Sequence, residues 1–372
     1  MKKKLDFCLV IYFLSISLVA ISVISGCGKG EEVATEPSGH VFMWYTSTVD
    51  NSADVGKYSS IVIDSLGVPK ISYYDGSPNY NLKYAVFNGV DWDTEIVDEE
   101  DSVGTYSSLD VLCSGYPRIA YYDGTNFRLQ YAEWTGVTWE IESVNGVGNG
   151  TDCSLALDSN FYPRISYYDA SNKHLKFAAW NQNLATWEIE TVDGSGEVGK
   201  YTSLALDDNG YAAISYYDDT NDNLKCARWT GSDWDIDTVD NGNIVGVYTS
   251  IALDSNGYPR ISYRDDYNGH LKYARWTGST WITETVDSST SNVGAYTSIA
   301  VDGSDAAHIS YYNGLWGDLK YTKWTGVTWE TETLDSSGNV GQYTSIALDS
   351  DGNPHISYYD VSNTSLKFAE WR

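Results

Sequence analysis

A set of four short segments recurs along the chain at a spacing of 47 or 48 residues. The first segment has the form Y-[ST]-S-[IL]-x-[LIV] and begins at Tyr58, Tyr106, Cys153, Tyr201, Tyr248, Tyr296 and Tyr343. The second resembles I-S-Y-Y-D and contains Ile71, Ile119, Ile165, Ile214, Ile261, Ile309 and Ile356. The third resembles L-K-Y-A-x-W and begins at Leu82, Leu129, Leu175, Leu224, Leu271, Leu319 and Leu366. Such a period indicates one supersecondary unit copied many times.

The fourth segment starts with Trp, runs to V-D, and follows the third segment in six copies. These copies begin at Trp92, Trp139, Trp187, Trp234, Trp281 and Trp329. The seventh copy stands at the other end of the body, where Trp44 to Asp50 reads W-Y-T-S-T-V-D, fourteen residues before Tyr58. The body therefore begins with a fourth segment and ends, at Trp371, with a third segment.

Each segment has the length and the aromatic and β-branched composition of a strand. Turn dipeptides such as Asn209-Gly210, Asn256-Gly257 and Asp351-Gly352 separate the first segment from the second and favour tight hairpins. Four strands in about 47 residues is the size of one blade of a propeller. We therefore predict an all-β, seven-bladed β-propeller with four antiparallel strands per blade. The N-terminal strand completes the last blade and closes the ring, whereas a linear solenoid would gain nothing from such a cut.

Aromatic residues occupy fixed positions in this pattern. Six of the 14 Trp end a third segment and seven begin a fourth, which predicts that they are buried in the wedge between blades. The paired tyrosines of the second segment, such as Tyr73 and Tyr74, alternate onto opposite blade faces and are expected in the core. Only Trp316 lies off the pattern.

The first forty residues read as a targeting segment. Lys2, Lys3 and Lys4 precede an apolar run over residues 7–24, and Ile24-Ser25-Gly26-Cys27 follows. This ending resembles the bacterial lipobox, which implies a signal peptide over 1–26, palmitate-type lipid on Cys27, a polar tether over 27–40 and one propeller over 41–372. Gly28 after the cysteine implies the outer membrane in a diderm host. An ordinary signal peptide and an uncleaved membrane anchor are the alternatives.

The formal net charge of −28 bears on the partners, and removing the leader with its three Lys and one Asp makes it more negative still. Such an acidic, extracytoplasmic surface repels phosphate backbones, so we expect no nucleic-acid partner. It suits cations, basic proteins and neutral sugars. Cys113, Cys153 and Cys226 each replace an ordinary repeat residue, with no spacing typical of a zinc site.

The loops from the second to the third strand, and from the fourth to the next first strand, are expected on one face. They carry a ring of carboxylates, with Asn313 in the sixth place: Asp75, Asp123, Asp169, Asp218, Asp265 and Asp360. The ring is either a rim that binds a cation or sugar hydroxyls, or a set of residues that each cap their own turn, and the repetition favours capping. No cofactor is predicted; a Ca²⁺ ion on these carboxylates is an alternative without a distinctive ligand pattern.

Binding sites need residues that occur once, and the same face carries few departures from the repeat. They are Trp316, His174, His270, Arg264 and Asn313. Trp316 has a glycine on one side and another two residues before it, so its indole is the first candidate platform for a ligand. Three arginines, Arg118, Arg164 and Arg260, share one position at the start of the second strand. We expect them at the opposite face, as exposed edge charges and not as a carboxylate-gripping triad.

Hairpins such as Thr135-Gly136-Val137-Thr138-Trp139 and Thr325-Gly326-Val327-Thr328-Trp329 join the third and fourth segments. They resemble the G-x-T-W tail of the Asp-box (BNR) repeat of sialidase-like propellers. The S-x-D half of that repeat is missing, because Trp134 stands where its Asp would be. The resemblance implies the fold and a tie to extracellular glycans, and it gives little support to catalysis.

Taken together, these features predict a monomeric, surface-tethered binding module that recognises a glycan or a protein through the loop face. A sialidase-like glycoside hydrolase or polysaccharide lyase is the alternative, although no single acid, base or nucleophile stands out. A structural scaffold component is the second alternative.

Overall fold

The computed structural model describes residues 43–144 and 150–372, and every regular element in these ranges is a β-strand. No helix in them is long and apolar enough to cross a membrane. The signal peptide, Cys27 and the tether lie outside the described residues. The body from Trp44 to Arg372 forms one compact unit.

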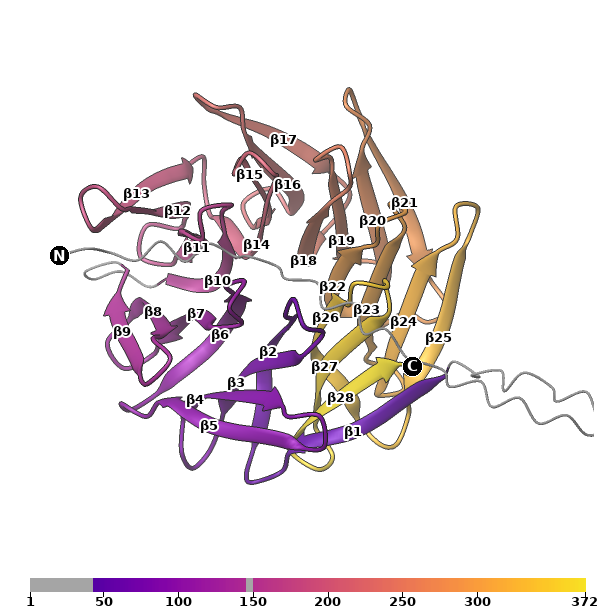
Figure 1. Cartoon of the computed structure of the whole chain (residues 1–372). Coiled ribbons are helices and arrows are strands. Elements are labelled where there is room, and N and C mark those ends of the chain that lie inside the picture. The colour runs from indigo at the N-terminus through magenta and orange to yellow at the C-terminus, as the bar shows by residue number, and fades with distance from the viewer. Residues whose placement is uncertain (1–42, 145–149) are drawn as a thin grey trace, which may run out of the picture. The chain divides into compact units, whose positions relative to one another are not determined.

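Twenty-eight strands form seven four-stranded antiparallel sheets arranged around a central axis (Figure 1). We number these sheets as blades 1 to 7, beginning with the sheet β2-β3-β4-β5. The innermost strands are β2 (Val55–Ile63), β6 (Val103–Val111), β10 (Gly150–Leu157), β14 (Val198–Leu206), β18 (Val245–Leu253), β22 (Val293–Val301) and β26 (Val340–Leu348). The prediction of a seven-bladed β-propeller is confirmed.

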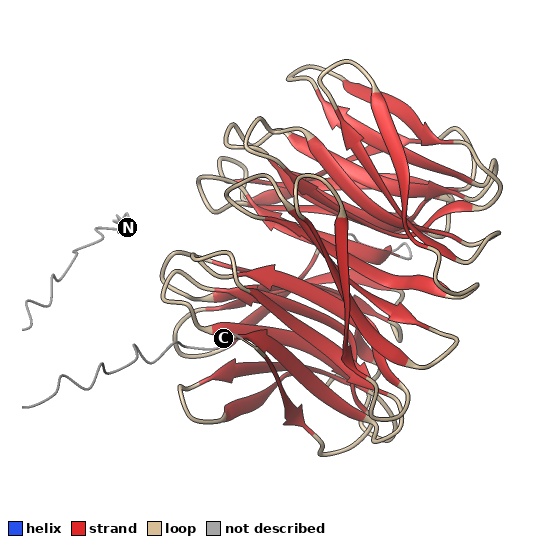
Figure 2. Ribbon diagram, turned by 90° about the vertical axis from the view of Figure 1, so that its right-hand side faces the viewer, coloured by secondary structure: helices blue, strands red, loops and turns tan. Residues whose placement is uncertain are grey.

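The second strands are β3 (Pro69–Asp75), β7 (Pro117–Asp123), β11 (Pro163–Asp169), β15 (Ala212–Asp218), β19 (Pro259–Asp265), β23 (Ala307–Asn313) and β27 (Pro354–Asp360). The third strands are β4 (Asn81–Phe87), β8 (Arg128–Trp134), β12 (His174–Asn181), β16 (Asn223–Trp229), β20 (His270–Trp276), β24 (Asp318–Trp324) and β28 (Ser365–Trp371). The outer strands are β5 (Trp92–Asp98), β9 (Trp139–Ser143), β13 (Thr186–Asp193), β17 (Trp234–Asp240), β21 (Trp281–Asp287), β25 (Trp329–Asp335) and β1 (Trp44–Asp50). Loops gather at the two ends of the strands (Figure 2).

Blade 7 closes the ring by combining both ends of the body. Its outer strand β1 pairs antiparallel with β28, and Trp44 lies opposite Trp371. The innermost strands of blades 7 and 1 also meet, because the Ser59 hydroxyl donates to the carbonyl of Tyr343 at 2.9 Å. The N-terminal strand thus completes the last blade, as predicted.

A buried clasp, formed by a tyrosine, an aspartate and usually a lysine, fixes the blades to their neighbours at six junctions of the described residues. In blade 6, Tyr311 is fully buried and donates its hydroxyl to Asp287 of blade 5 at 2.6 Å, and Lys320 donates to the same carboxylate oxygen at 2.7 Å. The tyrosine–aspartate bond recurs in Tyr73–Asp50, Tyr121–Asp98, Tyr216–Asp193, Tyr263–Asp240 and Tyr358–Asp335. The first tyrosine of the Y-Y-D pair is therefore a core residue, as predicted.

The tryptophans are less buried than the sequence suggests. All thirteen Trp of the repeat pattern are half-buried, and the largest fully buried side chains are the clasp tyrosines. The reason is their place at the blade periphery: Trp134 and Trp139, for example, are cross-strand partners on β8 and β9, with ring centroids 5.5 Å apart. Each outer strand is a sheet edge, so one side of its tryptophan remains in contact with water.

Candidate functional site

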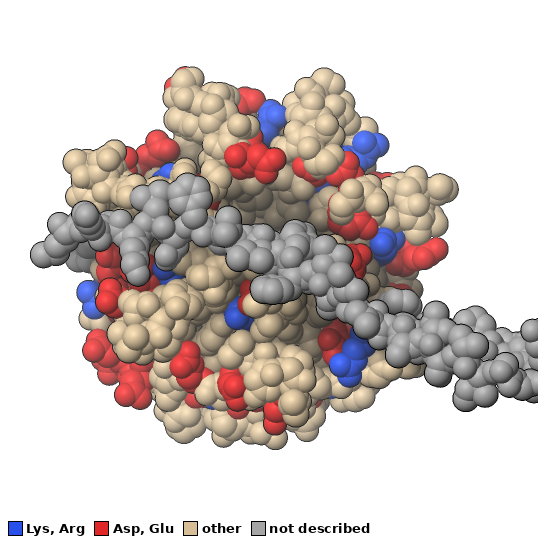
Figure 3. Space-filling view, in the orientation of Figure 1, with Lys and Arg blue, Asp and Glu red and all other residues tan. Residues whose placement is uncertain are grey.

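The predicted loop face exists. Among the described residues, a backbone bond joins the second-to-third loop to the preceding fourth-to-first loop in six blades, as between the Gly76 N–H and the Asp54 carbonyl at 2.7 Å and between the Gly314 N–H and the Asn292 carbonyl at 2.7 Å. Acidic side chains are spread around the molecule in Figure 3 and outnumber Lys and Arg there.

The ring of aspartates caps its own turns. Asp123 Oδ1 accepts the N–H groups of Thr125 and Asn126 at 3.1 and 2.9 Å, and its Oδ2 accepts the Asn126 amide at 2.9 Å. Asp169, Asp218, Asp265 and Asp360 make equivalent bonds. Asp75 bonds to the amide of Asn79 through Oδ2. Within the described ranges, no three His, Cys, Asp or Glu side chains gather in a way that could hold a metal ion.

The departures from the repeat lie on this face in three blades: His174 in blade 3, Arg264 and His270 in blade 5, and Asn313 and Trp316 in blade 6. Arg264 bridges two loops, donating to Asp266 at 2.7 Å and to Asn292 at 2.8 Å. Asn313 is buried and accepts the N–H of Leu315. His174 and His270 are half-buried at the starts of β12 and β20, so the fold does not bring them together.

Trp316 is 68% exposed, and the neighbouring Leu315 is also exposed. An exposed indole on a loop remains a candidate contact for a ligand.

The centre of the loop face carries a ring of residues that the sequence pattern did not identify as candidate binding residues. A bulge in each innermost strand turns one residue toward the axis; in blade 1 this is Tyr58, between the pairs Lys57–Tyr74 and Ser60–Ser72. Six tyrosines form this ring: Tyr58, Tyr106, Tyr201, Tyr248, Tyr296 and Tyr343. Consecutive ring centroids are 4.5–4.9 Å apart where two tyrosines are neighbours.

Asp152 occupies the seventh place of the tyrosine ring, so the alignment of the third repeat at Cys153 is wrong by one residue. Thr151 pairs with Tyr168 and Ser154 with Ser166, which puts Asp152 in the bulge. Its φ of 50° matches the 53–55° of the tyrosines. Cys153 takes the place of Ser107, since its thiol contacts the carbonyl of Tyr106 just as the Ser107 hydroxyl contacts that of Tyr58.

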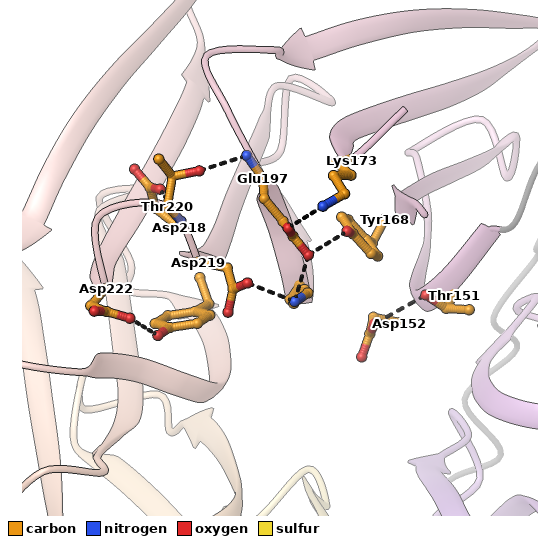
Figure 4. A network of polar contacts seen from close by, with 11 residues as sticks. Thr151, Asp152, Tyr168, Lys173, Glu197, Asp218, Asp219, Thr220 and Asp222 are labelled. Carbon is orange, nitrogen blue, oxygen red and sulfur yellow. Dashed lines mark hydrogen bonds and ion pairs between the residues drawn. The ribbon is translucent and has the colours of Figure 1, made fainter. Parts of the chain in front are cut away.

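A charged network forms the wall beside Asp152 (Figure 4). Glu197 accepts hydrogen bonds from Lys173 at 2.7 Å and from Tyr168 at 3.2 Å. Lys200 lies 2.8 Å from both Glu197 and Asp219. The bonds from the two lysines lower the pKa of Glu197 to about 2, so this carboxylate stays ionised.

The opposite face carries a cavity with a volume of about 550 Å³. It lies between blades 6 and 7, next to the strand that closes the ring, and we call it the seam pocket. Its wall combines three aromatic residues with charged and polar ones: Trp44, Trp371, Tyr321, Asp302, His308, Lys323, Glu330, Glu332 and Asp351, together with Gly303, Ser304 and the turn at 350–354. Pockets of 300–1,000 Å³ are the usual size for small-molecule ligands.

Trp44 differs from its counterparts in this pocket. At five other blade junctions the tryptophan Nε1–H donates to a carboxylate of the preceding blade at 3.0–3.2 Å, in the pairs Trp139–Glu95, Trp187–Glu142, Trp234–Glu190, Trp281–Asp237 and Trp329–Glu284. The equivalent carboxylate for Trp44 is Glu332, which also lines the pocket. The Trp44 Nε1 atom is buried and has no hydrogen-bond partner among the described residues.

A comparison with the junction of blades 4 and 5 explains why the seam pocket is open. There the guanidinium of Arg228 lies 4.1 Å from the ring centroid of Trp276, and the cavity measures about 240 Å³. In blade 6 the equivalent residue is Lys323, which pairs with Asp302 at 3.3 Å. The side chain of Lys323 is shorter than that of an arginine, and its ammonium group pairs with Asp302 in the turn instead of stacking on a tryptophan. This leaves the larger volume of the seam pocket.

His308 joins Asp302 and Tyr321 in the pocket wall. Its Nε2 lies 3.1 Å from Asp302 Oδ2, and its Nδ1 lies 2.7 Å from the Tyr321 hydroxyl. Burial lowers the pKa of His308, so the imidazole is neutral at pH 7. Basic residues pair with the same turn aspartate in four other blades, in Lys70–Asp64, Arg164–Asp158, Arg260–Asp254 and His355–Asp349. The contact is thus part of the repeat, which favours a structural role over catalysis.

Arg118, Arg164 and Arg260 share the repeat position of His308, near the start of the second strand. They lie in blades 2, 3 and 5 and do not converge, as predicted. They are not exposed edge charges, however. The side chains of Arg118 and Arg260 are only 12% and 14% exposed, because Arg118 pairs with Glu133 and Arg260 with Asp254.

The described residues thus define a propeller with an axial cavity on the loop face and the seam pocket between blades 6 and 7 on the opposite face. Solved structures share the fold at low identity. An ulvan lyase from a polysaccharide lyase family matches 87% of this chain and 95% of its own at 13% identity, with a TM-score of 0.60. A fucose-recognising lectin of Aleuria aurantia, described as a six-bladed propeller, matches 79% and 99% at 13% identity with 0.51. The SapL1 lectin, solved with α-methyl fucoside, matches 75% and 95% at 14% identity with 0.51. No family model and no curated protein matches the sequence.

Proposed function

We propose that this protein is a surface-tethered glycan-binding module and that the seam pocket holds the sugar. The observation that carries the proposal is the wall of that pocket. Aromatic surfaces from Trp44, Trp371 and Tyr321 lie beside the charged groups of Lys323 and Glu332.

Sugars bind where an aromatic face covers their C–H groups and polar side chains exchange hydrogen bonds with their hydroxyls. The unpaired indole N–H of Trp44 is a donor of this kind, and a buried donor without a partner is costly. A sugar hydroxyl would satisfy it. Two lectins and a polysaccharide lyase among the structures of the same fold support the proposal, as do the hairpins that resemble the Asp-box tail.

The experiment is a glycan-array screen of the purified chain, followed by titration of the best ligand against three variants. Lys323→Arg preserves the charge and is expected to restore the stacked cation seen in Arg228 over Trp276. The filled pocket should bind the sugar about tenfold or more weakly, a loss of about 1.4 kcal/mol. The melting temperature should not fall.

Glu190→Ala is the matched control. Glu190 is the counterpart of Glu332 in another blade, where its carboxylate accepts the indole N–H of Trp234. This variant should leave sugar affinity unchanged. Trp316→Ala tests the loop face instead. A loss of about 1–3 kcal/mol in that variant, with Lys323→Arg binding like the parent, would move the site from the seam pocket to the loop face.

The tether is the second part of the proposal, and it rests on the leader and on Ile24-Ser25-Gly26-Cys27. Cys27→Ser is expected to abolish lipidation and to leave the protein unprocessed or outside the membrane fraction. Metabolic labelling with palmitate and membrane fractionation measure this. Unchanged labelling and fractionation in the variant would contradict the lipoprotein hypothesis.

A further inference from the structure

The axial cavity of the loop face has a volume of about 440 Å³. Its wall is the ring of six tyrosines and Asp152, joined by Thr151, Tyr168 and Lys200. This site lies at the opposite face from the seam pocket and shares no lining residue with it. It breaks the sevenfold repeat at one position, Asp152, so its chemistry is set by that residue.

Asp152 brings a negative charge that the electrostatic interaction with Lys200 compensates only in part. Its carboxylate accepts a hydrogen bond from the Thr151 hydroxyl at 3.2 Å and interacts with the backbone of Tyr201. The nearest cation lining the cavity, Lys200, lies 2.8 Å from both Glu197 and Asp219. Burial consequently raises the pKa of Asp152 to about 6.

The tyrosines supply the complementary surface. Aromatic rings attract a cation through their faces, and phenolic oxygens accept hydrogen bonds from N–H groups. Desolvation raises the pKa of Tyr201 and Tyr248 to about 12, so the ring carries no competing charge of its own. A carboxylate among neutral aromatic rings is the arrangement that suits an organic cation.

We propose that the axial cavity binds the primary ammonium group of a small amine, with Asp152 as its counter-ion and the tyrosine ring as its wall. A primary ammonium has three N–H donors, which match one carboxylate and the phenolic oxygens around it. The net charge of −28 attracts such ligands to the surface. The proposal does not depend on glycan binding at the seam pocket.

The experiment titrates the full chain with methylammonium, glucosamine and glucose by calorimetry, at fixed ionic strength and pH 7.5. Methylammonium and glucosamine should bind in a way that depends on Asp152, and glucose, which has no ammonium group, should show no binding that depends on Asp152. Asp152→Asn should weaken ammonium binding about tenfold or more, since it removes the charge but keeps the size. Asp152→Tyr, which restores the repeat residue, should abolish binding and still fold, as its six counterparts do.

The matched control is Asp222→Asn. Asp222 lies on the same face and accepts the Tyr217 hydroxyl at 2.6 Å, but it does not line the cavity. This variant should bind methylammonium like the parent. No ammonium binding to the parent, equal binding by Asp152→Asn, or equal competition by K⁺ would each overturn the proposal.

Binding should also weaken as the pH falls below about 6, because protonation removes the charge of Asp152. The other titratable groups that line the cavity are the ring tyrosines, Tyr168 and Lys200. The pKa of each of them is raised, so none titrates between pH 5 and 8. Asp152→Asn should have no such pH dependence. A parent whose affinity is flat from pH 5 to 8 would contradict the role of Asp152.

Discussion

A chain that begins at residue 51 is expected to melt on the order of 10 °C below a chain that begins at residue 40. The shorter chain lacks β1, so β28 loses its partner and becomes an open edge. It also lacks Trp44, whose ring packs 5.0 Å from that of Tyr321. Because this ring is half-buried, its loss should cost less than the roughly 3–5 kcal/mol of a fully buried aromatic.

The deletion also removes Asp50, which holds Tyr73 and Lys83 in the clasp between blades 7 and 1. Tyr73 would lose its acceptor, and Lys83 would lose its counter-ion and keep only its hydrogen bond to Ser52 at 3.2 Å, which adds about 1–3 kcal/mol to the loss. Calorimetric melting of the two chains measures the combined effect. Equal melting temperatures would mean that β1 does not contribute to ring closure.

The second large effect is expected in the clasps. Asp287→Ala should lower the free energy of unfolding by about 3–5 kcal/mol, because it leaves the buried Lys320 without its counter-ion and Tyr311 without an acceptor. Tyr311→Phe removes one hydrogen bond to a charged group and should cost about 1.5–3 kcal/mol. Guanidinium unfolding curves give these values. The paired change Asp287→Leu with Lys320→Met should cost less than Asp287→Ala; a larger loss would contradict the account.

The clasps also predict acid sensitivity. Burial alone would raise the pKa of Asp287, but the hydrogen bonds from Lys320, Ser289 and Tyr311 outweigh it and lower the value to about 2. A carboxyl whose folded-state pKa lies below its ordinary 3.8 stabilises the fold fully above that value. This contribution is lost as the pH falls toward 2.

Two other aspartates act in the opposite direction. Burial raises the pKa of Asp110 and of Asp152 to about 6, so protonation of these groups stabilises the fold as the pH falls through that value. Stability is therefore expected to peak between about pH 4 and 6. Unfolding curves at pH 7, 5, 3.5 and 2.5 measure this, and Asp287→Asn should reduce the loss below pH 4.

The repeat made the fold predictable from the sequence. Every blade carries the same four segments, and the missing fourth segment at Trp371 together with the extra one at Trp44 defined the closure. The degree of burial was harder to predict, because a sequence position does not reveal how far a blade edge is covered. The outer tryptophans are half-buried for this reason, and the ion pairs of Arg118 and Arg260 were missed.

The candidate site was less predictable. The spacing of the repeats predicted Cys153 at the position of the ring tyrosines. The pairing of β10 with β11 puts Asp152 at that position, because the place of the bulge depends on the neighbouring strand. Had the match of Ser154-Leu155 to Ser203-Leu204 been used, Asp152 would have stood out as the exception in the tyrosine ring. No sequence pattern indicated the seam pocket, since its volume depends on whether the side chain of Lys323 stacks on a tryptophan or pairs with Asp302.

The pairing of β1 with β28 has a consequence for how the protein is made. The first strand of the body to leave the ribosome is the one whose partner leaves last, because Trp44 faces Trp371. Blades 1 to 6 are each contiguous in sequence and can form in order as they emerge, but blade 7 waits for β26, β27 and β28. The ring can therefore close only after β28 has been synthesised, and a chain truncated before β28 is left with an unpaired N-terminal strand.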